Sequence, residues 1–558
     1  MTLLEQLRQA RTLSDFAIIL GYEPKKLSYL LYILPKEKPL YNQFSIKKRS
    51  GGERVISAPC EELKELQKRL LNLLDKCSQE INASKSKNHN SISHGFKKRH
   101  SIVTNAVKHK NKQYVFNIDL ENFFGTINFQ RVCGFFVKSR EFQLHSKIAE
   151  IIALISCHQG SLPQGAATSP IISNLITHIL DVRLVKFSTK IGVFYSRYAD
   201  DLTFSTNKKN FPIEAALKSI ELKHQWIIGK DLNEIINRSG FKVNSSKTRM
   251  QYKNSRQEVT GLIVNKKINT KREYKQKVRA MVHALVHRGE FNIFESDSGM
   301  YVKGSLNQLR GMLSFIESIN PRDGCSKANE KMIGRDIYHK FLFYKYFYFG
   351  DKPILICEGK TDGVYIREAI KWFSGRDEFK GLKFDIFKYS KLNGRVLGLN
   401  GGYSDLTKFI AQYLTFFNVN TAPSSNMPVI VVIDNDDAAK KILKDERNEN
   451  RDFYHKVKNL YVVTTPLVGT EVESEIEDLF KIEALRIELN GKTFHKEKDL
   501  NDGKHYGKHV FSEKIVKSKE YNIDFSGFEE LLKRIQNAIK HFETQTNENR
   551  KSSIEPIN

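Results

Sequence analysis

Two adjacent carboxylates, Asp200 and Asp201, lie between two short runs of residues that favour β-strands, at 192–197 and 202–205. This pattern predicts a β-hairpin with both aspartates at its tip. The strands would hold the tip rigid, and two carboxylates held in this way can bind a divalent metal ion. Aspartate is also a common turn residue, so the hairpin alone does not decide between a metal site and an ordinary turn.

A third carboxylate, Asp119, ends an apolar segment at 114–120 that we expect to form a buried strand. Its alternative role is to cap a helix that follows. Together with the two hairpin aspartates it makes three carboxylates at strand ends. Three carboxylates are the minimum set that holds two Mg²⁺ ions beside a polyphosphate, where one ion activates a hydroxyl and the other stabilises the leaving group.

The charge of the chain is divided unevenly along its 558 residues, although its net value is +27. From residue 351 to the end there are 33 basic and 33 acidic residues, so the whole excess lies in residues 1–350. A basic first part and a neutral second part predict two modules with different partners. Nucleic acid is the polyanion that we expect the first part to bind.

Several features favour a cytoplasmic protein without a membrane partner. No uninterrupted apolar stretch is long enough to span a bilayer, and the N-terminus lacks the basic and then apolar order of a signal peptide. The six cysteines form no Cys-x-x-Cys pair, which argues against a zinc site and is typical of reduced thiols.

The first part of the chain combines helical and strand patterns. Residues 1–43 predict small helices, 44–59 two strands joined by a basic turn, and 61–80 a helix with leucines on one face. Residues 271–318 read as basic helices interrupted at Gly289 and Gly304.

After the linker at 350–353 the pattern changes to alternating strands and helices. Strands are expected at 353–357, 429–433 and 460–464, and a helix at 362–373. This alternation predicts a parallel α/β sheet. The polar tail after Thr544 is expected to be frayed.

Four motifs occur in the order found in reverse transcriptases: the strand that ends in Asp119, then Leu-Pro-Gln-Gly-Ala-Ala-Thr-Ser-Pro at 162–170, Tyr-Ala-Asp-Asp at 198–201, and a segment at 240–247. Residues 44–265 therefore resemble the fingers and palm of a reverse transcriptase. This resemblance implies an α+β right-hand polymerase with a helical thumb at 266–350. The bacterial retron enzymes are the subgroup favoured by Asn-Ala-x-x-His at 105–109 and Val-Thr-Gly at 259–261, although a helix face and a strand end would also explain these two motifs.

The resemblance implies a role for each matching residue. Asp119, Asp200 and Asp201 would be catalytic and bind two Mg²⁺ ions, and the Phe124 ring would exclude a ribonucleotide 2′-OH. The residues expected at the incoming nucleotide and template are Arg54, Lys48, Phe124, Gln164, Gly165 and Lys247. Those expected at the RNA and primer are Asn105, His109, Tyr198, Thr260, Gly261, Arg272, Lys275, Lys277 and Arg279.

A second acidic pattern lies in the neutral part of the chain. Glu358 ends an apolar strand and precedes a Gly turn into a helix, and a second apolar strand runs into Asp434-Asn435-Asp436-Asp437. Both acidic patterns follow strands of the expected parallel sheet, at the carboxyl ends where such sheets bind ligands. A helix cap and a polar turn are the alternative explanations.

This second pattern resembles a TOPRIM domain over 351–490, followed by an extension at 491–558. The resemblance implies one or two further Mg²⁺ ions at Glu358, Asp434 and Asp436, with Asp437 as an accessory ligand. By similarity to TOPRIM nucleases of the overcoming-lysogenisation type, Glu477 would add a carboxylate and Lys508 a catalytic positive charge. TOPRIM domains also serve topoisomerases and primases. Topoisomerases also need a separate tyrosine-bearing domain, for which this chain has no room. Primases need a polymerase activity, which the first acidic site would already supply. We therefore expect a nuclease with an unknown nucleic-acid target.

As a whole, the chain resembles a retron reverse transcriptase fused to a TOPRIM effector. The resemblance implies dNTPs, a cognate non-coding RNA and its branched RNA–DNA product (msDNA) as partners, with priming from a 2′-OH. It also implies abortive-infection defence against phage and leaves open a homo-oligomer that contains msDNA. Two alternatives remain: an inactive, structural TOPRIM module, and a mobile-element enzyme of the group II intron type. The absence of a maturase or HNH-type tail and the two retron motifs argue against the second alternative.

Overall fold

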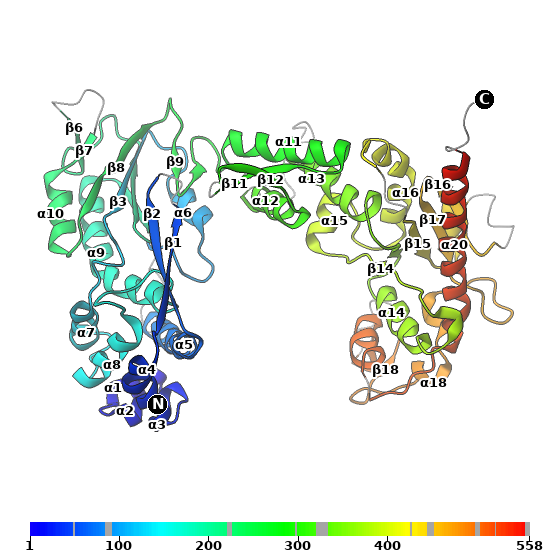
Figure 1. Cartoon of the computed structure of the whole chain (residues 1–558), viewed down its shortest axis with the longest axis horizontal. Coiled ribbons are helices and arrows are strands. Elements are labelled where there is room, and N and C mark those ends of the chain that lie inside the picture. The colour runs from blue at the N-terminus through cyan, green and yellow to red at the C-terminus, as the bar shows by residue number, and fades with distance from the viewer. Residues whose placement is uncertain are drawn as a thin grey trace. The chain divides into compact units, whose positions relative to one another are not determined.

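The chain folds into two compact units, the first built mainly from Met1–Lys275 and the second mainly from the residues that follow (Figure 1). This computed structural model describes every residue except 48–50, 84–91, 220–225, 296–297, 320–332, 424–426, 444–450, 497–502, 519 and 553–558. No helix in the described part of the chain is both long and apolar enough to cross a membrane.

An antiparallel four-stranded sheet forms the centre of the first unit, in the order β4 (Phe194–Tyr198), β5 (Asp201–Thr206), β3 (Tyr114–Leu120) and β8 (Val243–Tyr252). The predicted hairpin is confirmed, because β4 pairs with β5 and Tyr198 lies opposite Asp201. Apolar side chains of β3 and β5 pack into the main core of the unit, so one face of the sheet is buried.

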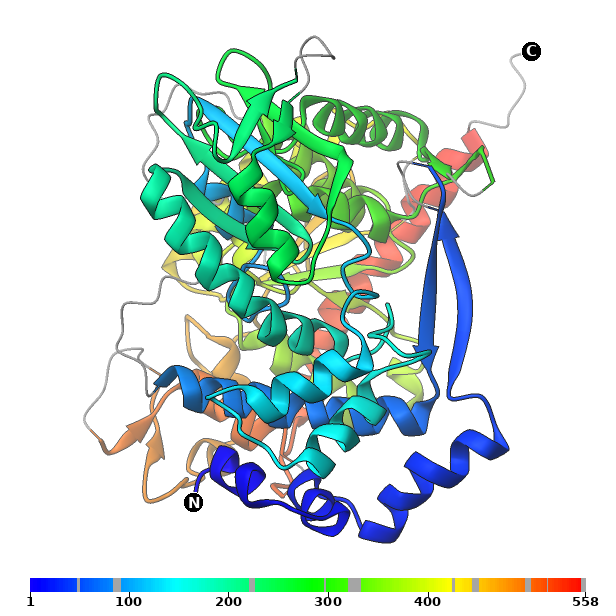
Figure 2. The same cartoon turned by 90° about the vertical axis from the view of Figure 1, so that its left-hand side faces the viewer.

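Helices complete this core. The leucine face predicted at 61–80 is buried in α5 (Glu61–Ala83), and the helix α9 (Ser169–Ile191) runs from the 162–170 motif to the start of the hairpin. The strands predicted at 44–59 form the β1 (Tyr41–Lys47) and β2 (Glu53–Pro59) hairpin, drawn in blue in Figure 2. The remaining elements of the first unit are α1 (Leu3–Gln9), α2 (Leu13–Leu20), α3 (Pro24–Ser28), η1 (Tyr29–Ile33), α4 (Leu34–Glu37), α6 (Ile102–Lys108), α7 (Phe129–Lys138), α8 (Ser146–Ser156), β6 (Ala216–Lys218), β7 (Trp226–Ile228), α10 (Lys230–Arg238), β9 (Glu258–Val259) and β10 (Leu262–Ile263).

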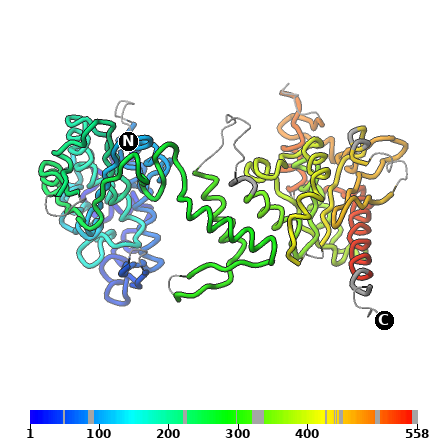
Figure 3. The backbone as a smooth tube through the Cα atoms, turned by 90° about the horizontal axis from the view of Figure 1, so that it is seen from above, coloured from blue at the N-terminus to red at the C-terminus, as the bar shows by residue number. Residues whose placement is uncertain are grey.

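The helical prediction for 271–318 is wrong in its middle. Between α11 (Arg272–Arg288) and α12 (Leu306–Ile319) the chain forms an antiparallel hairpin of β11 (Asn292–Glu295) and β12 (Met300–Lys303) (Figure 3). Ile293 and Phe294 in β11, and Tyr301 and Val302 in β12, are residue types that favour strands. The second expected break, Gly304, packs its backbone so tightly against the Phe291 ring that a Cβ there would lie 2.1 Å from it.

A five-stranded sheet forms the centre of the second unit, in the order β14 (Asp385–Ile386), β13 (Ile354–Cys357), β15 (Val429–Ile433), β17 (Leu460–Thr464) and β16 (Tyr454–Val457). The first four strands are parallel, and β16 is antiparallel to β17. The three central strands coincide with the strands expected from sequence, and their continuous Ile and Val runs are buried, as in sheets covered on both faces.

Helices cover this sheet. On one side, α14 (Asp362–Phe373), at the position expected from sequence, shares a core with α20 (Glu529–Ser552), so the tail expected to fray after Thr544 is helical to residue 552. The other helices and short strands are α13 (Ile333–Phe343), η2 (Tyr344–Tyr348), η3 (Asp377–Phe379), α15 (Lys391–Leu397), α16 (Tyr403–Phe417), α17 (Asp437–Leu443), η5 (Ile476–Leu479), α18 (Ile482–Leu485), β18 (Thr493–Phe494), β19 (His505–Tyr506), α19 (Lys508–Val510), η6 (Phe511–Val516) and η7 (Ser526–Phe528).

An aromatic-rich segment at 341–349, directly before the linker at 350–353, packs into the second unit. The ring of Phe347 lies 4.9 Å from that of Phe409 in α16, and the ring of Phe343 lies 5.2 Å from that of Tyr413. The Asn459 side chain donates a hydrogen bond to the Phe347 carbonyl at 3.1 Å. These contacts make α13 and η2 part of the core of the second unit rather than a free connection.

Candidate active sites

The three aspartates of the first unit gather at one end of the central sheet. Asp119 and Asp201 are direct cross-strand neighbours on β3 and β5. Asp200 lies in the turn between β4 and β5, and its carbonyl accepts a hydrogen bond from the Leu120 amide at 3.0 Å, which ties the turn to β3. Ala199, the other turn residue, has φ of +55°, a left-handed conformation that suits a tight hairpin turn.

Desolvation and mutual repulsion together raise the pKa values of this group. Loss of hydration and the charges of Asp200 and Asp119 raise the pKa of Asp201 to about 7, although its side chain reaches solvent. Desolvation and the Asp119 charge likewise raise the pKa of Asp200. The Lys247 ammonium lies 2.9 Å from Asp119 Oδ2, and this hydrogen bond raises the pKa of the lysine. One cation therefore already sits at the group, and a second cationic charge would relieve the remaining repulsion.

The chemistry of these side chains fits Mg²⁺, because carboxylate oxygens are its preferred protein ligands. Among the described residues, no three His, Cys, Asp or Glu side chains are arranged so that they could already hold a metal ion. The three carboxylates are instead brought together by the strands that carry them, and Asp119 is held by Lys247.

The residues expected at the nucleotide lie on neighbouring elements. The Gln164 carbonyl accepts a hydrogen bond from the Ser57 amide of β2 at 2.7 Å. Gly165 has φ of +126°, and a Cβ there would lie 2.5 Å from the Ser57 carbonyl oxygen, so only glycine permits this approach. Arg54 lies on β2, and its charge lowers the pKa of Asp200 against the larger effects that raise it. Phe124 packs against the Phe123 ring at 5.2 Å, and Lys48 lies outside the described residues.

Asn105 and His109 are completely buried. The two ring nitrogens of His109 lie 2.7 Å from the hydroxyls of Ser196 and Ser205, and Ser196 donates to Asn105 Oδ1 at 2.6 Å. Burial lowers the pKa of His109 to about 3, with smaller contributions from nearby positive charges. The pair thus fastens α6 and the turn after it to strands β4 and β5, and it presents no surface to RNA in this structure.

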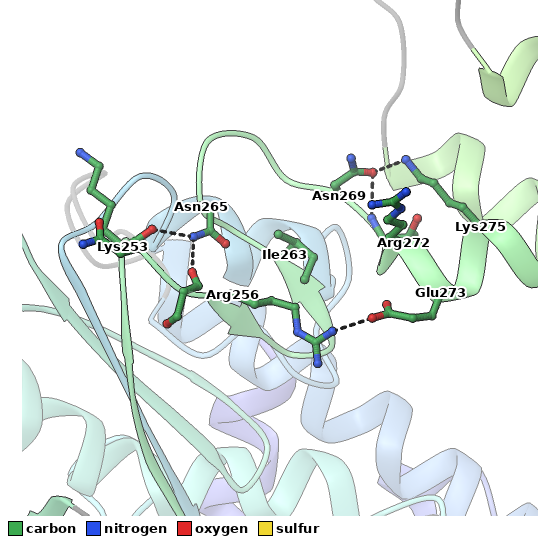
Figure 4. Close-up of a pocket in the computed structure, with 11 residues that line it drawn as sticks. Lys253, Arg256, Ile263, Asn265, Asn269, Arg272, Glu273 and Lys275 are labelled. Atoms are coloured by element: carbon green, nitrogen blue, oxygen red, sulfur yellow. Dashed lines mark hydrogen bonds and ion pairs between the residues drawn. The ribbon is translucent and has the colours of Figure 1, made fainter. Parts of the chain in front are cut away.

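A basic cavity of about 530 Å³ is lined by the turn at 253–256, which follows β8, and by residues from the segment 263–275 that leads into α11 (Figure 4). Arg272 and Lys275, which we expected to contact RNA, line it, and Lys275 Nζ donates to Asn269 at 2.5 Å. Lys253 and Arg256, which the motifs did not indicate, also line it. Lys277 and Arg279 are exposed on α11.

The remaining residues expected at the primer lie in turns. Thr260, with φ of +47°, and Gly261, with φ of +82°, form the turn between β9 and β10. The Thr260 hydroxyl donates to the Ile102 carbonyl at 3.2 Å. Tyr198 ends β4 directly before the turn that carries Asp200.

The acidic residues of the second unit meet at the carboxyl ends of β13 and β15, which pair in parallel. Glu358 follows β13, and its carboxylate accepts a hydrogen bond from the Asp434 amide at 3.4 Å. Asp434 Oδ1 accepts from the Ile476 amide at 3.0 Å, so the chain after β15 is tied to η5. Asp436 accepts from the Ala439 amide at 3.1 Å and thereby caps α17, which begins at Asp437.

Burial controls the charge of this second group. Glu477 is completely buried and its pKa is raised by desolvation, while Lys508 donates to it at 2.9 Å. Desolvation, followed by the charges of Asp362, Glu358 and Glu477, raises the pKa of Asp434 to about 8. Asp362 is therefore part of the group, although sequence reasoning treated it only as a helix start. Its Oδ2 accepts from the Gly359 amide at 2.6 Å.

Comparison with known proteins identifies a family for part of the chain. Residues 46–272 match the family model described as reverse transcriptase (RNA-dependent DNA polymerase). The chain is 31% identical to the retron Ec86 reverse transcriptase of Escherichia coli, over 52% of this chain and 79% of that protein. It is 30% identical to the retron Mx65 reverse transcriptase of Myxococcus xanthus, over 56% and 69%. It is 31% identical to the Mx162 enzyme of the same organism, over 51% and 59%.

A solved telomerase from Candida albicans in complex with a fragment of telomeric RNA matches with a TM-score of 0.31 and 11% identity, over 68% of this chain and 65% of that chain. This likeness is too distant to support an argument about the present chain.

Proposed function

Because this chain belongs to the retron reverse transcriptases, and so is an RNA-directed DNA polymerase, we propose that it copies a cognate non-coding RNA into branched msDNA and that its second unit is a Mg²⁺-dependent nuclease. The observation that carries the polymerase centre is the convergence of Asp119, Asp200 and Asp201 at one sheet end. Bound Mg²⁺ would supply an activated 3′-hydroxyl and a neutralised pyrophosphate leaving group.

The residues around the aspartates would then bind and orient the substrates. Lys247 holds Asp119 and places a positive charge beside the position of the triphosphate. Gly165 allows the nucleotide-side loop to approach β2, where Arg54 offers a guanidinium to the phosphates. Phe124 would exclude the 2′-OH of a ribonucleotide. The basic cavity at Arg272 and Lys275 suits the RNA backbone.

The priming reaction is the part of this proposal that the family implies. A retron enzyme starts DNA from the 2′-OH of a guanosine in its own RNA, so product and template stay joined. The test is to express the chain with the RNA encoded beside its gene and to digest the purified nucleic acid with ribonuclease. DNA that retains a 2′-linked ribonucleotide is expected. DNA without any attached ribonucleotide would refute 2′-OH priming, and the matched variant Asp201→Asn should give no DNA.

For the second unit, the supporting observation is a group of acidic residues at the carboxyl ends of two parallel strands, with Lys508 beside the buried Glu477. Glu358, Asp434 and Asp436 would hold Mg²⁺ with Glu477 and Asp437 as further ligands, and Lys508 would stabilise charge on a transferred phosphate. In the cytoplasm of a bacterium the branched product would keep this nuclease inactive, and phage interference with the product would release it.

A structural TOPRIM module is the rival that this proposal must exclude. Glu358→Gln keeps the size of the side chain and removes its charge, and Asp385→Asn, on the edge strand β14, is the matched control. Glu358→Gln should abolish phage defence with msDNA at its normal level, while Asp385→Asn should defend normally. Defence that persists in Glu358→Gln would favour the structural module.

A further inference from the structure

Arg197 is a completely buried arginine in β4, three residues before Asp200. Its guanidinium binds the carboxylate of Asp181 in α9 through two parallel hydrogen bonds, from Nε to Oδ1 at 2.8 Å and from Nη2 to Oδ2 at 2.7 Å. The Tyr195 hydroxyl donates to Oδ1 of the same carboxylate at 2.9 Å. Burying such a pair costs the hydration of both ions, so its net effect on stability alone does not account for its place behind the catalytic turn.

The third donor of this guanidinium reaches the turn itself. Arg197 Nη1 donates to the carbonyl of Ala199 at 3.1 Å. Ala199 has φ of +55°, which is unfavourable for a residue with a side chain unless surrounding contacts hold it there. The hydrogen bond from Arg197 is a contact of this kind, and it acts on the peptide unit that leads into Asp200.

A second attachment holds the same turn from outside. The His94 amide donates to the Arg197 carbonyl at 2.8 Å, and a Cβ on Gly95 would lie 2.6 Å from the Ala199 nitrogen, so this segment lies directly against the turn. Asn174 of α9 donates to the Gly95 carbonyl at 2.9 Å. The helix α9 is therefore linked to the turn twice, through Asp181 and Arg197 and through Asn174 and Gly95.

We propose that Arg197 is a positioning residue of the polymerase centre. Clamped by Asp181, it fixes the turn that carries Asp200 and the start of β5, and it thereby sets the affinity of Asp200 and Asp201 for the divalent metal. Arg197 itself contacts neither substrate nor metal. This inference rests on the proposed metal-binding role of the two aspartates and concerns the geometry in which they are held.

The test measures metal binding on the full-length chain, without nucleic acid, by titration with Mn²⁺ followed by electron paramagnetic resonance. All proteins carry Glu358→Gln to weaken the second acidic group. Arg197→Lys keeps the charge but cannot make the two-fold contact with Asp181 and also reach Ala199. Supporting residues of metal sites change metal affinity by about 10- to 100-fold. The relevant Mn²⁺ site is the one whose binding is abolished by Asp201→Asn. We expect Arg197→Lys to weaken Mn²⁺ binding at this site about tenfold.

A second readout is primer extension on a defined RNA template over a range of Mg²⁺ concentrations. Arg197→Lys should need about tenfold more Mg²⁺ for half-maximal rate, with the KM for dNTP nearly unchanged at saturating metal. Leu66→Ala, a cavity in the buried face of α5 with no link to the turn, is the control for general destabilisation. It should leave the Mn²⁺ affinity unchanged.

If Arg197→Lys does not fold, Tyr195→Phe decides the question, because it removes one hydrogen bond that holds the Asp181 carboxylate against Arg197 and should weaken Mn²⁺ binding in the same direction by a smaller factor. Wild-type affinity in the folded variant overturns the inference about Arg197 alone. If Asp201→Asn removes no Mn²⁺ binding, the aspartates do not bind the metal. That result overturns both their proposed metal role and this inference.

Discussion

Acidification should destabilise the first unit through one buried histidine. His109 is completely buried, and both ring nitrogens contact serine hydroxyls, Ser196 and Ser205, at 2.7 Å. Burial, and to a lesser extent the charge of Lys112, lowers its pKa to about 3. The imidazole therefore stays neutral in the folded protein at every pH at which the chain would normally be handled.

The size of the effect follows from the difference between the two states. In the unfolded chain the histidine has a pKa of about 6.5, so below that pH the unfolded state takes up a proton that the folded state does not. Because the folded pKa is the lower one, the stabilisation is complete above pH 6.5 and is lost as the pH falls toward 3. At pH 5 the loss is about 2 kcal/mol. For a unit of this size it lowers Tm by about 5 °C.

The assay is calorimetric unfolding of the full-length chain at pH 7.5 and pH 5.0, in wild type and in His109→Gln. Glutamine can still bond a serine hydroxyl but does not titrate, so the variant should lack this part of the pH dependence. His178→Gln, which changes an exposed histidine of α9, should keep it. Equal pH dependence in wild type and His109→Gln would show that the imidazole is not held neutral, and would refute the reasoning.

Three further predictions concern single side chains. Gly165→Ala should reduce primer extension by at least tenfold, measured on a defined RNA template, because its Cβ would lie 2.5 Å from the Ser57 carbonyl; a normal rate would contradict the close approach. Lys247→Met should lower the extension rate by about 100-fold and Lys247→Arg by less, since only the first removes the charge beside the reacting phosphates; equal rates in both would exclude an electrostatic role. Lys508→Met should lower the unfolding free energy of the second unit by about 3 kcal/mol in denaturant titration, because it leaves Glu477 buried without its partner. Primer extension should stay at the wild-type rate, and unchanged stability would contradict the pairing.

Local sequence patterns predicted the elements that carry the acidic residues. The hairpin around Asp200 was visible because β-formers flank the turn on both sides, and β3 was visible as a short apolar run that ends in Asp119. The strands β15 and β17 have continuous Ile and Val runs, which mark strands buried on both faces. Patterns of this kind depend only on neighbours in the sequence, so they predict a strand or a turn without knowledge of the tertiary contacts.

Contacts between distant segments were not visible in the same way. Nothing near Arg197 in the sequence indicates Asp181, which lies 16 residues earlier in α9, and an arginine before a turn is usually an exposed residue. Asp362 was expected only as the first residue of a helix, because its closeness to Asp434 depends on the pairing of β13 with β15. The β11 and β12 hairpin was missed because its strands are short and lie between two helices.

The central claim, that this retron polymerase makes one defined RNA-linked DNA, is tested most directly by sequencing all DNA that copurifies with the full-length chain from cells carrying its neighbouring RNA gene. The account predicts a single short species, abundant in wild type, joined to RNA and absent in Asp200→Asn. A heterogeneous set of cDNAs that map to many cellular RNAs would contradict it and would favour a mobile-element type of reverse transcriptase.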